Sequence, residues 1–350
     1  MRAIVYHGQR DIRVGDVPAP GPPGPGFLKL AVIACGICGS DLREYLEGPR
    51  SIPTRPHPLT AKTLPVILGH EFVARVAEVG EGVSGFAAGD RVTLDACWRC
   101  GECFWCRKGE YNCCVRSAST GLHADGGMAE QVTVPAYTAY KVPEGISDQA
   151  ASLTEPASVA VHACRRAEIS PGDTVVVLGA GPIGLFVLQA ARTVGAGRVI
   201  VVEPGRVRAG LASELGASLV LDPREDNVAS RVFDLTNGLG ADVVFECVGA
   251  ADVLDEALRI SRRKATIVVV GVPEGKILVN VYRLVLHEKQ LRGSLGYAHD
   301  FPTALQWMVD GRINADRLVT REIPLAEAVT GGFEALAKSR DELVKVLVRP

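Results

Sequence analysis

The chain has 350 residues, of which 47% are hydrophobic and 22% charged, and its formal net charge is −2. This length is typical of two domains, and the near-neutral charge excludes a global field that would favour nucleic acid or an anionic membrane. No apolar run reaches the roughly 18 residues of a membrane span, and the N-terminus has no apolar signal core, so we expect a cytoplasmic protein.

The region up to about residue 150 is expected to be β-rich. Short alternating runs, among them "FLKLAVIA", "EFVARVAEVG", "DRVTL" and "AEQVTVPA", are separated by turns rich in glycine and proline. Two cysteines three positions apart, Cys35 and Cys38, occur in this region in the stretch "ACGICGSDLREY". Their spacing is compatible with a redox pair or with part of a zinc site.

From about Ser152 the pattern changes to short apolar runs that alternate with helical stretches. Continuous apolar strands separated by helices predict a doubly wound parallel sheet, because such strands are buried on both faces. The expected strands are 174–178, 198–203, 218–221, 242–246, 266–271 and 290–296. Beyond about Tyr297, two amphipathic helical stretches and a terminal β-like run "LVKVLVRP" follow. The fold class is therefore α/β.

The stretch "VVVLGAGPIGLF" predicts a dinucleotide-binding loop between the first of these strands and the following helix. The first glycine permits a tight turn, the second lets the backbone approach a pyrophosphate, and the third lets helix and strand pack closely. The loop residues are Gly179, Gly181, Pro182, Ile183 and Gly184. The phosphates would meet free N–H groups at the start of the helix.

An acid at the end of the second strand, Glu203, predicts NAD rather than NADP. A carboxylate at this position hydrogen-bonds the ribose hydroxyls and repels a 2′-phosphate. Two arginines, Arg206 and Arg208, follow closely, and either could weaken this preference. We expect Arg208 to lie at the cofactor site.

Six cysteines fall between residues 97 and 114, in "CWRCGECFWCRKGEYNCC". Thiolates spaced by two residues can converge on one tetrahedral zinc ion, and a closed four-thiolate site stabilises a loop without doing chemistry. An iron–sulfur cluster is the competing interpretation, which the third gap and the absence of a following proline disfavour. Spacing alone does not choose four ligands from the six.

Several stretches in this order resemble the zinc-dependent medium-chain dehydrogenases. They are "CGICGSDLREY", "GHEFVARVAEVGEGVSGFAAGDRV", the cysteine-rich lobe, "EPASVAVHA" and "GAGPIG". The resemblance covers essentially the whole chain and is greatest to the polyol branch, which includes sorbitol, threonine and 2,3-butanediol dehydrogenases. It implies a GroES-like catalytic domain in residues 1–155 with a zinc lobe at 97–114, a Rossmann domain in 156–294, and a return to the catalytic domain in 295–350.

The resemblance also implies two zinc ions per chain. In the family the structural zinc is held by a C-x2-C-x2-C-x7-C pattern, which here selects Cys100, Cys103, Cys106 and Cys114 and leaves Cys97 and Cys113 as extra thiols. A second, catalytic zinc would be held by Cys38, His70 and Glu71, with Glu155 either binding it or holding a water beside it. One thiolate, one imidazole and a carboxylate leave an open coordination position, as catalytic zinc requires.

The implied reaction is hydride transfer between a secondary alcohol and NAD. Zinc polarises the substrate oxygen, and Ser40 matches the serine that accepts the hydroxyl proton in this family. The relay then usually continues to a histidine, but this chain has Arg43 there. A guanidinium has no acceptor. Three interpretations follow: the proton passes directly to water, Arg43 contacts an anionic group of cofactor or substrate, or Arg43 pairs with Glu47 on the same helix.

The expected substrate is a vicinal diol or polyol such as 2,3-butanediol, with acetoin as the ketone. Alternatives are a sugar alcohol, a cyclitol or a 3-hydroxy amino acid. More distant alternatives are a non-catalytic NAD-binding redox sensor and a zinc-ribbon nucleic-acid binder, the latter disfavoured by a thin basic patch in the lobe. The resemblance further implies a homodimer or homotetramer joined through Rossmann sheet edges, involving residues 277–282.

Overall fold

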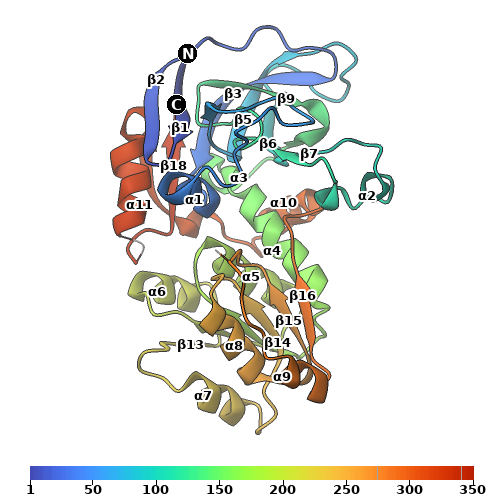
Figure 1. Cartoon of the computed structure of the whole chain (residues 1–350), viewed down its shortest axis with the longest axis vertical. Coiled ribbons are helices and arrows are strands. Elements are labelled where there is room, and N and C mark those ends of the chain that lie inside the picture. Colours follow the sequence, from blue (N-terminus) through green and yellow to red (C-terminus); the bar gives the residue numbers. More distant parts are fainter. Residues whose placement is uncertain (274, 340) are drawn as a thin grey trace. The chain divides into compact units, whose positions relative to one another are not determined.

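The computed structural model describes residues 1–273, 275–339 and 341–350. The chain divides into two compact units (Figure 1). Unit 1 comprises residues 1–155, 301–309 and 315–350, and unit 2 comprises residues 156–300 and 310–314. Unit 1 is thus built from segments at both ends of the sequence, whereas unit 2 is nearly continuous. Within the described residues, no helix combines the length and the apolar character needed to cross a bilayer.

Unit 2 is a six-stranded parallel sheet with helices between its strands. The order β13-β12-β11-β14-β15-β16 reverses direction beside the first strand, which is the arrangement of dinucleotide-binding folds. Its strands are β11 (Thr174–Leu178), β12 (Arg198–Val202), β13 (Leu219–Leu221), β14 (Ala241–Glu246), β15 (Ser261–Val269) and β16 (Gln290–Gly293). The predicted parallel sheet and α/β class are confirmed.

Several helices of unit 2 pack against this sheet. Helix α5 contacts β11 and β12, and α8 contacts β14 and β15. The helices are α4 (Thr154–Ala167, whose first two residues belong to unit 1), α5 (Pro182–Thr193), α6 (Arg206–Glu214), α7 (Val228–Leu235), α8 (Ala251–Ile260) and α9 (Val281–Leu286). Helix α7 was not anticipated, although Asn227 caps its N-terminus by accepting a hydrogen bond from the Ser230 N–H.

Unit 1 is built around a seven-stranded mixed sheet in the order β10-β6-β5-β3-β18-β17, with β9 paired to β3. These strands are β3 (Phe27–Gly36), β5 (Glu71–Val79), β6 (Arg91–Leu94), β9 (Gln131–Pro135), β10 (Ala139–Lys141), β17 (Val319–Pro324) and β18 (Lys345–Arg349). A smaller sheet joins β1 (Arg2–Gly8), β2 (Asp11–Asp16) and β4 (Val66–Ile67), and a two-stranded ribbon joins β7 (Cys97–Trp98) and β8 (Ala118–Ser119). The β-rich character expected of this region is confirmed.

Short helices complete unit 1. They are α1 (Gly39–Glu47), α2 (Phe104–Arg107), α3 (Asp148–Ser152), α10 (Phe301–Val309) and α11 (Ala335–Lys338), with 3-10 turns at Tyr111–Cys113, Ala136–Thr138, Asp316–Leu318 and Leu325–Glu327. The amphipathic stretch expected to form a helix over residues 325–339 is not one continuous α-helix, because residues Ala328–Glu334 form a π-helical segment. Apolar side chains of all these layers form one large core cluster in unit 1.

Candidate metal centres and cofactor site

The cysteine-rich lobe closes on itself between the two strands of the β7–β8 ribbon. The sulfur atoms of four cysteines lie within 4.8 Å of one another, and these four are the ones that the family pattern selects: Cys100, Cys103, Cys106 and Cys114. Cys97 and Cys113 lie outside this set. All ten cysteines are free thiols.

The spacing of the lobe sulfurs fits a zinc ion. Cys100 Sγ lies 3.5 Å from Cys114 Sγ and 3.9 Å from Cys106 Sγ. A tetrahedral ion with bonds of ~2.3 Å needs sulfur atoms roughly 3.8 Å apart. Backbone N–H groups of residues 102 and 103 lower the pKa of the Cys100 thiol to about 6, whereas burial raises the pKa of Cys106 to about 12. The separations of the sulfur atoms, and not these pKa values of the metal-free thiols, suit the site to a closed, structural metal.

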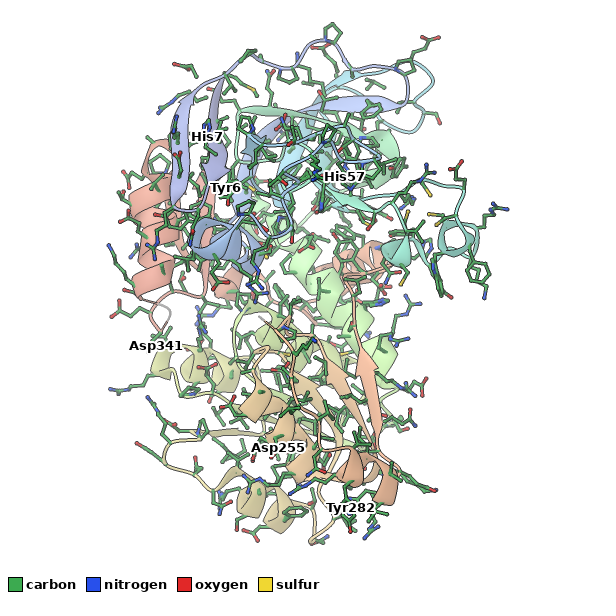
Figure 2. The ribbon with its side chains drawn as sticks, viewed as in Figure 1. Tyr6, His7, His57, Asp255, Tyr282 and Asp341 are labelled. Atoms are coloured by element: carbon green, nitrogen blue, oxygen red, sulfur yellow. The ribbon has the colours of Figure 1, made fainter. Side chains whose placement is uncertain are left out.

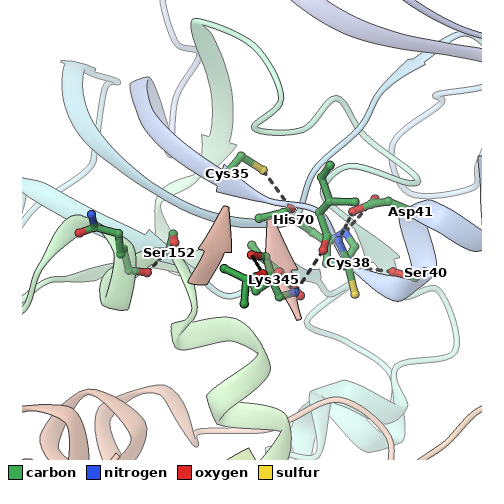
Figure 3. Close-up of polar contacts among 12 residues, drawn as sticks. Cys35, Cys38, Ser40, Asp41, His70, Ser152 and Lys345 are labelled. Carbon is green, nitrogen blue, oxygen red and sulfur yellow. Dashed lines mark hydrogen bonds and ion pairs between the residues drawn. The ribbon is translucent and has the colours of Figure 1, made fainter. Parts of the chain in front are cut away.

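A second cluster in unit 1 lies where β3 ends, α1 begins and β5 begins (Figure 3). Ligand atoms of Cys38, His70 and Glu71 lie within 4.8 Å of one another. His70 is 5% and Glu71 1% exposed, so solvent reaches these two ligands little. The turn that presents them uses Gly69 at φ +99°, where a Cβ would collide with Cys35 Sγ and with Met128.

The buried carboxylate of Asp41 organises two of these ligands, and it was missed in the sequence. Its Oδ2 accepts a hydrogen bond of 2.9 Å from the Cys38 N–H, which fixes the start of α1. Its Oδ1 lies 3.5 Å from His70 Nδ1. Within the described residues, neither of these last two atoms has a hydrogen-bond partner. A histidine that binds metal through Nε2 directs its Nδ1–H at such a carboxylate, so the pair fits a zinc ligand.

Electrostatics in this cluster depend on the histidine's neighbours. Burial alone would lower the pKa of His70, but the nearby charges of Asp41 and Cys38 raise it well above its usual range. Ser40 Oγ lies 3.2 Å from His70 Nε2, on the ligand side of the ring. The structure therefore brings the expected serine together with the expected ligands.

Cys35 does not form a redox pair with Cys38. Its side chain is completely buried, and its Sγ donates a hydrogen bond to the Gly36 carbonyl at 3.6 Å. Burial, followed by the charges of Asp41 and Glu71, raises the pKa of this thiol well above its usual value. A thiol that stays protonated is a poor nucleophile and a poor metal ligand.

Glu155 lies in the first turn of α4 and is half-buried. It is not a member of the three-residue ligand set, but its charge is felt by the buried ammonium of Lys345. Burial alone would lower the pKa of Lys345, whereas the charges of Glu71, Cys38 and Glu155 raise it above its ordinary value. Lys345, which gave no sequence signal, is therefore part of the same charged group.

Arg43 is half-buried in α1, one turn beyond Ser40. The interpretation in which it pairs with Glu47 is wrong, because Glu47 forms its ion pair with Arg50 instead. No ion pair or hydrogen bond of the Arg43 guanidinium occurs among residues 1–273, 275–339 and 341–350. Its charge is thus available to an anionic group.

The glycine loop of unit 2 has the shape that a dinucleotide needs. Gly179 has φ +93°, and a Cβ at Gly184 would collide with the Gly179 carbonyl, so only glycine permits this contact between strand and helix. The position of a Cβ at Gly181 is open space, which leaves room for a phosphate beside the start of α5. Pro182 and Ile183 form the first positions of that helix.

The carboxylate of Glu203 lies beside this loop. Its Oε2 accepts a hydrogen bond of 2.7 Å from the Ala180 N–H, and its Oε1 accepts one of 2.8 Å from the Gly205 N–H. The side chain is thereby fixed between the loop and the start of α6, and Arg208 follows in the first turn of that helix. This is the place where an acid would meet a ribose.

Two family models match the chain: "Alcohol dehydrogenase GroES-like domain" over residues 24–144 and "Zinc-binding dehydrogenase" over residues 182–310. The chain is 39% identical over 352 residues to the (R,R)-butanediol dehydrogenase of Bacillus subtilis, with 100% of both covered. A sorbitol dehydrogenase of the same organism is 33% identical and covers 100% of this chain, which spans 97% of it.

Solved structures agree with these matches. The crystal structure of 2R,3R-butanediol dehydrogenase from Bacillus subtilis superposes with a TM-score of 0.93 at 38% identity, covering 100% of this chain and 99% of that one. A zinc-binding dehydrogenase from Sinorhizobium meliloti bound to NADP gives 0.89 at 32% identity, with 100% and 99% coverage. The chain belongs to the zinc-dependent medium-chain dehydrogenase family.

Proposed function

We propose that this protein is an NAD-dependent, zinc-containing alcohol dehydrogenase that interconverts a secondary alcohol and its ketone, with a vicinal diol such as 2,3-butanediol as substrate. The observation that carries the proposal is the buried set of Cys38, His70 and Glu71, whose three ligand atoms lie within 4.8 Å of one another. Three protein ligands leave one coordination position open for substrate. The butanediol dehydrogenase relatives support the diol.

In this proposal unit 1 is the catalytic domain and unit 2 binds NAD. Cys38, His70 and Glu71 would hold a zinc ion, which would supply the Lewis acidity needed at the substrate oxygen. Ser40 Oγ, 3.2 Å from His70 Nε2, accepts the hydroxyl proton on the ligand side of the ring. Glu155 adds a further negative charge near Lys345 and the proposed zinc ligands. The four lobe cysteines would hold a second zinc ion, which would stabilise the fold.

The N–H groups at the start of α5 bind the pyrophosphate, and Glu203 accepts hydrogen bonds from the ribose. The carboxylate of Glu203, fixed by two backbone N–H groups, disfavours a 2′-phosphate and supports NAD over NADP. Arg208, in the first turn of α6, would lie near the adenosine end of the cofactor in this proposal. Because one solved relative binds NADP, both coenzymes belong in the test.

The test is an activity assay in which each candidate substrate is combined with each coenzyme. The zinc-loaded protein is mixed with (R,R)-butanediol, sorbitol or threonine and with NAD or NADP, and reduced coenzyme is followed by absorbance. We expect the diol with NAD to give the highest kcat/KM, by roughly tenfold or more over the other pairs. Absence of reduced coenzyme with every substrate would reject the dehydrogenase proposal, and a preference for sorbitol or threonine would reassign the substrate.

Arg43 distinguishes the proton path of this chain. We propose that Ser40 and the cofactor ribose pass the proton to water, because a guanidinium cannot accept it. Arg43→His would then restore a titrating group and shift the pH dependence of alcohol oxidation. A pH–rate profile of the variant that matches the wild type would contradict this path.

The exposed edge of unit 2 supports a homo-oligomer. Strand β16 is the edge of the sheet, and apolar side chains lie exposed beside it on the segment before α9 and on α9 itself. Leu278 is 98% exposed and Tyr282 is 72% exposed. Figure 2 labels Tyr282 on the ribbon. An apolar strip beside an unpaired strand is a site of association between copies. Leu278→Glu should reduce the mass measured by light scattering, and an unchanged mass would exclude this edge.

We also propose a reducing compartment such as the cytosol, because the lobe and active-site thiols must stay reduced to bind metal.

A further inference from the structure

A buried ion pair joins the candidate zinc ligand Glu71 to Lys345. Lys345 Nζ lies 2.6 Å from Glu71 Oε2 and donates a second hydrogen bond of 3.2 Å to the Ile37 carbonyl. The two side chains are 1% and 2% exposed, and the residues are 274 positions apart in the sequence. A pair so well shielded from water is strongly coupled, because neither charge can be solvated if its partner leaves.

The sheet of unit 1 brings these two side chains together across a glycine. Strand β3 lies between β5 and β18, and its residue Gly36 is the register partner of Glu71 on one side and of Leu347 on the other. A Cβ at Gly36 would collide with Glu71 Oε2 and lie 3.5 Å from Lys345 Cδ. The missing side chain therefore leaves the space in which the ammonium reaches the carboxylate.

The Glu71 carboxylate can thus interact with two cations. One is Lys345, and the other is the metal that Cys38, His70 and Glu71 are placed to bind. Like charges repel strongly in a buried site, so an ammonium on the ligand carboxylate opposes the binding of a divalent ion. Because Lys345 holds the Glu71 carboxylate in place before the metal binds, less conformational entropy is lost on binding. This gain is small compared with the repulsion between the ammonium and the metal ion.

We propose that Lys345 is a resident counter-ion of Glu71, which holds this carboxylate in place while the metal is absent and lowers the affinity of the site for zinc. Lys345 is a positioning residue in this role, and Gly36 makes the contact possible. The inference rests on the proposed zinc site. Its consequence is that one substitution has opposite effects on the stability of the metal-free protein and on metal binding.

The experiment replaces the ammonium by a neutral side chain of similar length, Lys345→Met. Zinc is left in the lobe, and Co²⁺ or Zn²⁺ is titrated into the other site in competition with a chromophoric chelator. We expect the variant to bind the metal roughly tenfold or more tightly. The melting temperature of the protein without metal at this site should fall by about 5–10 °C, because Glu71 is left buried and unpaired.

Three further variants make the result specific. Lys345→Arg keeps the charge and should return both measurements toward the wild type. The double variant Lys345→Met/Glu71→Gln removes both charges, so without metal it should melt above Lys345→Met. Lys338→Met is the matched control, because Lys338 is exposed and pairs with Glu334 at 3.3 Å in the same unit. It should change neither measurement.

The outcomes separate this inference from the proposed function. Unchanged or weaker metal binding by Lys345→Met would overturn the counter-ion role, and so would a double variant that melts no higher than Lys345→Met. If Lys345→Met does not fold without metal, the metal affinity of the double variant is compared with that of Glu71→Gln instead. Equal metal affinities of these two proteins would overturn the inference. Wild-type protein that binds no second metal would instead overturn the proposed function.

Discussion

The two candidate metal clusters of unit 1 are built in opposite ways. The lobe takes four thiols from residues 100–114, most of them half-exposed, and their sulfur atoms accept hydrogen bonds from N–H groups of the same short segment. The cluster of Cys38, His70 and Glu71 is buried, mixes three ligand types, and has Asp41 and Lys345 packed around it. The difference lies in where the supporting contacts come from: backbone in the lobe, and distant side chains in the buried cluster.

This difference separates a stabilising site from a reactive one. Four equal thiolates saturate a tetrahedral ion and leave nothing for a substrate to bind. Three ligands leave a position open, and the surrounding charges then control how strongly the metal is held. We therefore expect damage to the buried cluster to remove activity, and damage to the lobe to remove stability.

The largest expected effect is on turnover in Cys38→Ser. Loss of the only thiolate ligand should lower kcat/KM by at least about 10³-fold, because the Lewis acid is lost. Bound zinc, measured by atomic emission, should fall from two ions per chain to one, and the melting temperature should change little. Cys35→Ser is the matched control and should keep both ions. A Cys38→Ser protein with two zinc ions would contradict the ligand assignment.

Cys103→Ser should reverse that pattern. We expect one zinc ion fewer and a loss of at least about 3 kcal/mol in the free energy of unfolding, because the lobe loses its metal. The kcat measured at low temperature, where the protein stays folded, should remain within a few-fold of the wild type. Cys113→Ser, which changes an exposed thiol outside the set, should alter neither quantity. Equal stability of both variants would show that the lobe holds no structural ion.

Asp41→Asn tests the support of the buried cluster. The amide can still accept the hydrogen bond from the Cys38 N–H, but it no longer carries a charge toward His70 Nδ1. Zinc affinity, measured by chelator competition, should fall by roughly 10–100-fold while the helix stays capped. An affinity equal to the wild type would mean that Asp41 serves the helix alone.

The smallest effect is a pH dependence that His70 of the buried cluster should produce. In protein without its metal, the pKa of His70 is raised above the value in the unfolded chain by Asp41 and Cys38. The resulting stability is fully present below about pH 6.5 and is lost as the pH rises through the folded pKa. The urea midpoint of metal-free protein should therefore fall toward alkaline pH. The slope should be smaller in His70→Gln, and an identical slope would refute this origin.

Local patterns in the sequence were enough to predict the parallel sheet and the glycine loop and to locate the cysteine-rich lobe, whereas the choice of its four ligands came from the family pattern. Their geometry depends on neighbours in the chain, as in the strand–glycine–helix connection around Gly181. Asp41 had a weak signal, since it stands three residues after the cap of α1. Lys345 had none, because its partner is 274 residues away and meets it only through strand order. Glu47 pairs with Arg50 and not with Arg43. Both arginines are close enough to Glu47 in the sequence, so spacing alone does not predict which of them forms the ion pair.

The position of β18 has a consequence for biosynthesis. This strand lies between β3 and β17 in the sheet, yet along the chain it follows the whole of unit 2. During synthesis all strands of unit 2 are made before β18, and the end of β3 at Cys35 and Gly36 lacks its β18 partner until residues 345–349 emerge. Unit 1 can therefore complete its sheet only after the whole of unit 2 has been made, and until then Glu71 lacks its partner Lys345. Newly made chains should pass through a stage in which unit 2 resists protease and unit 1 does not.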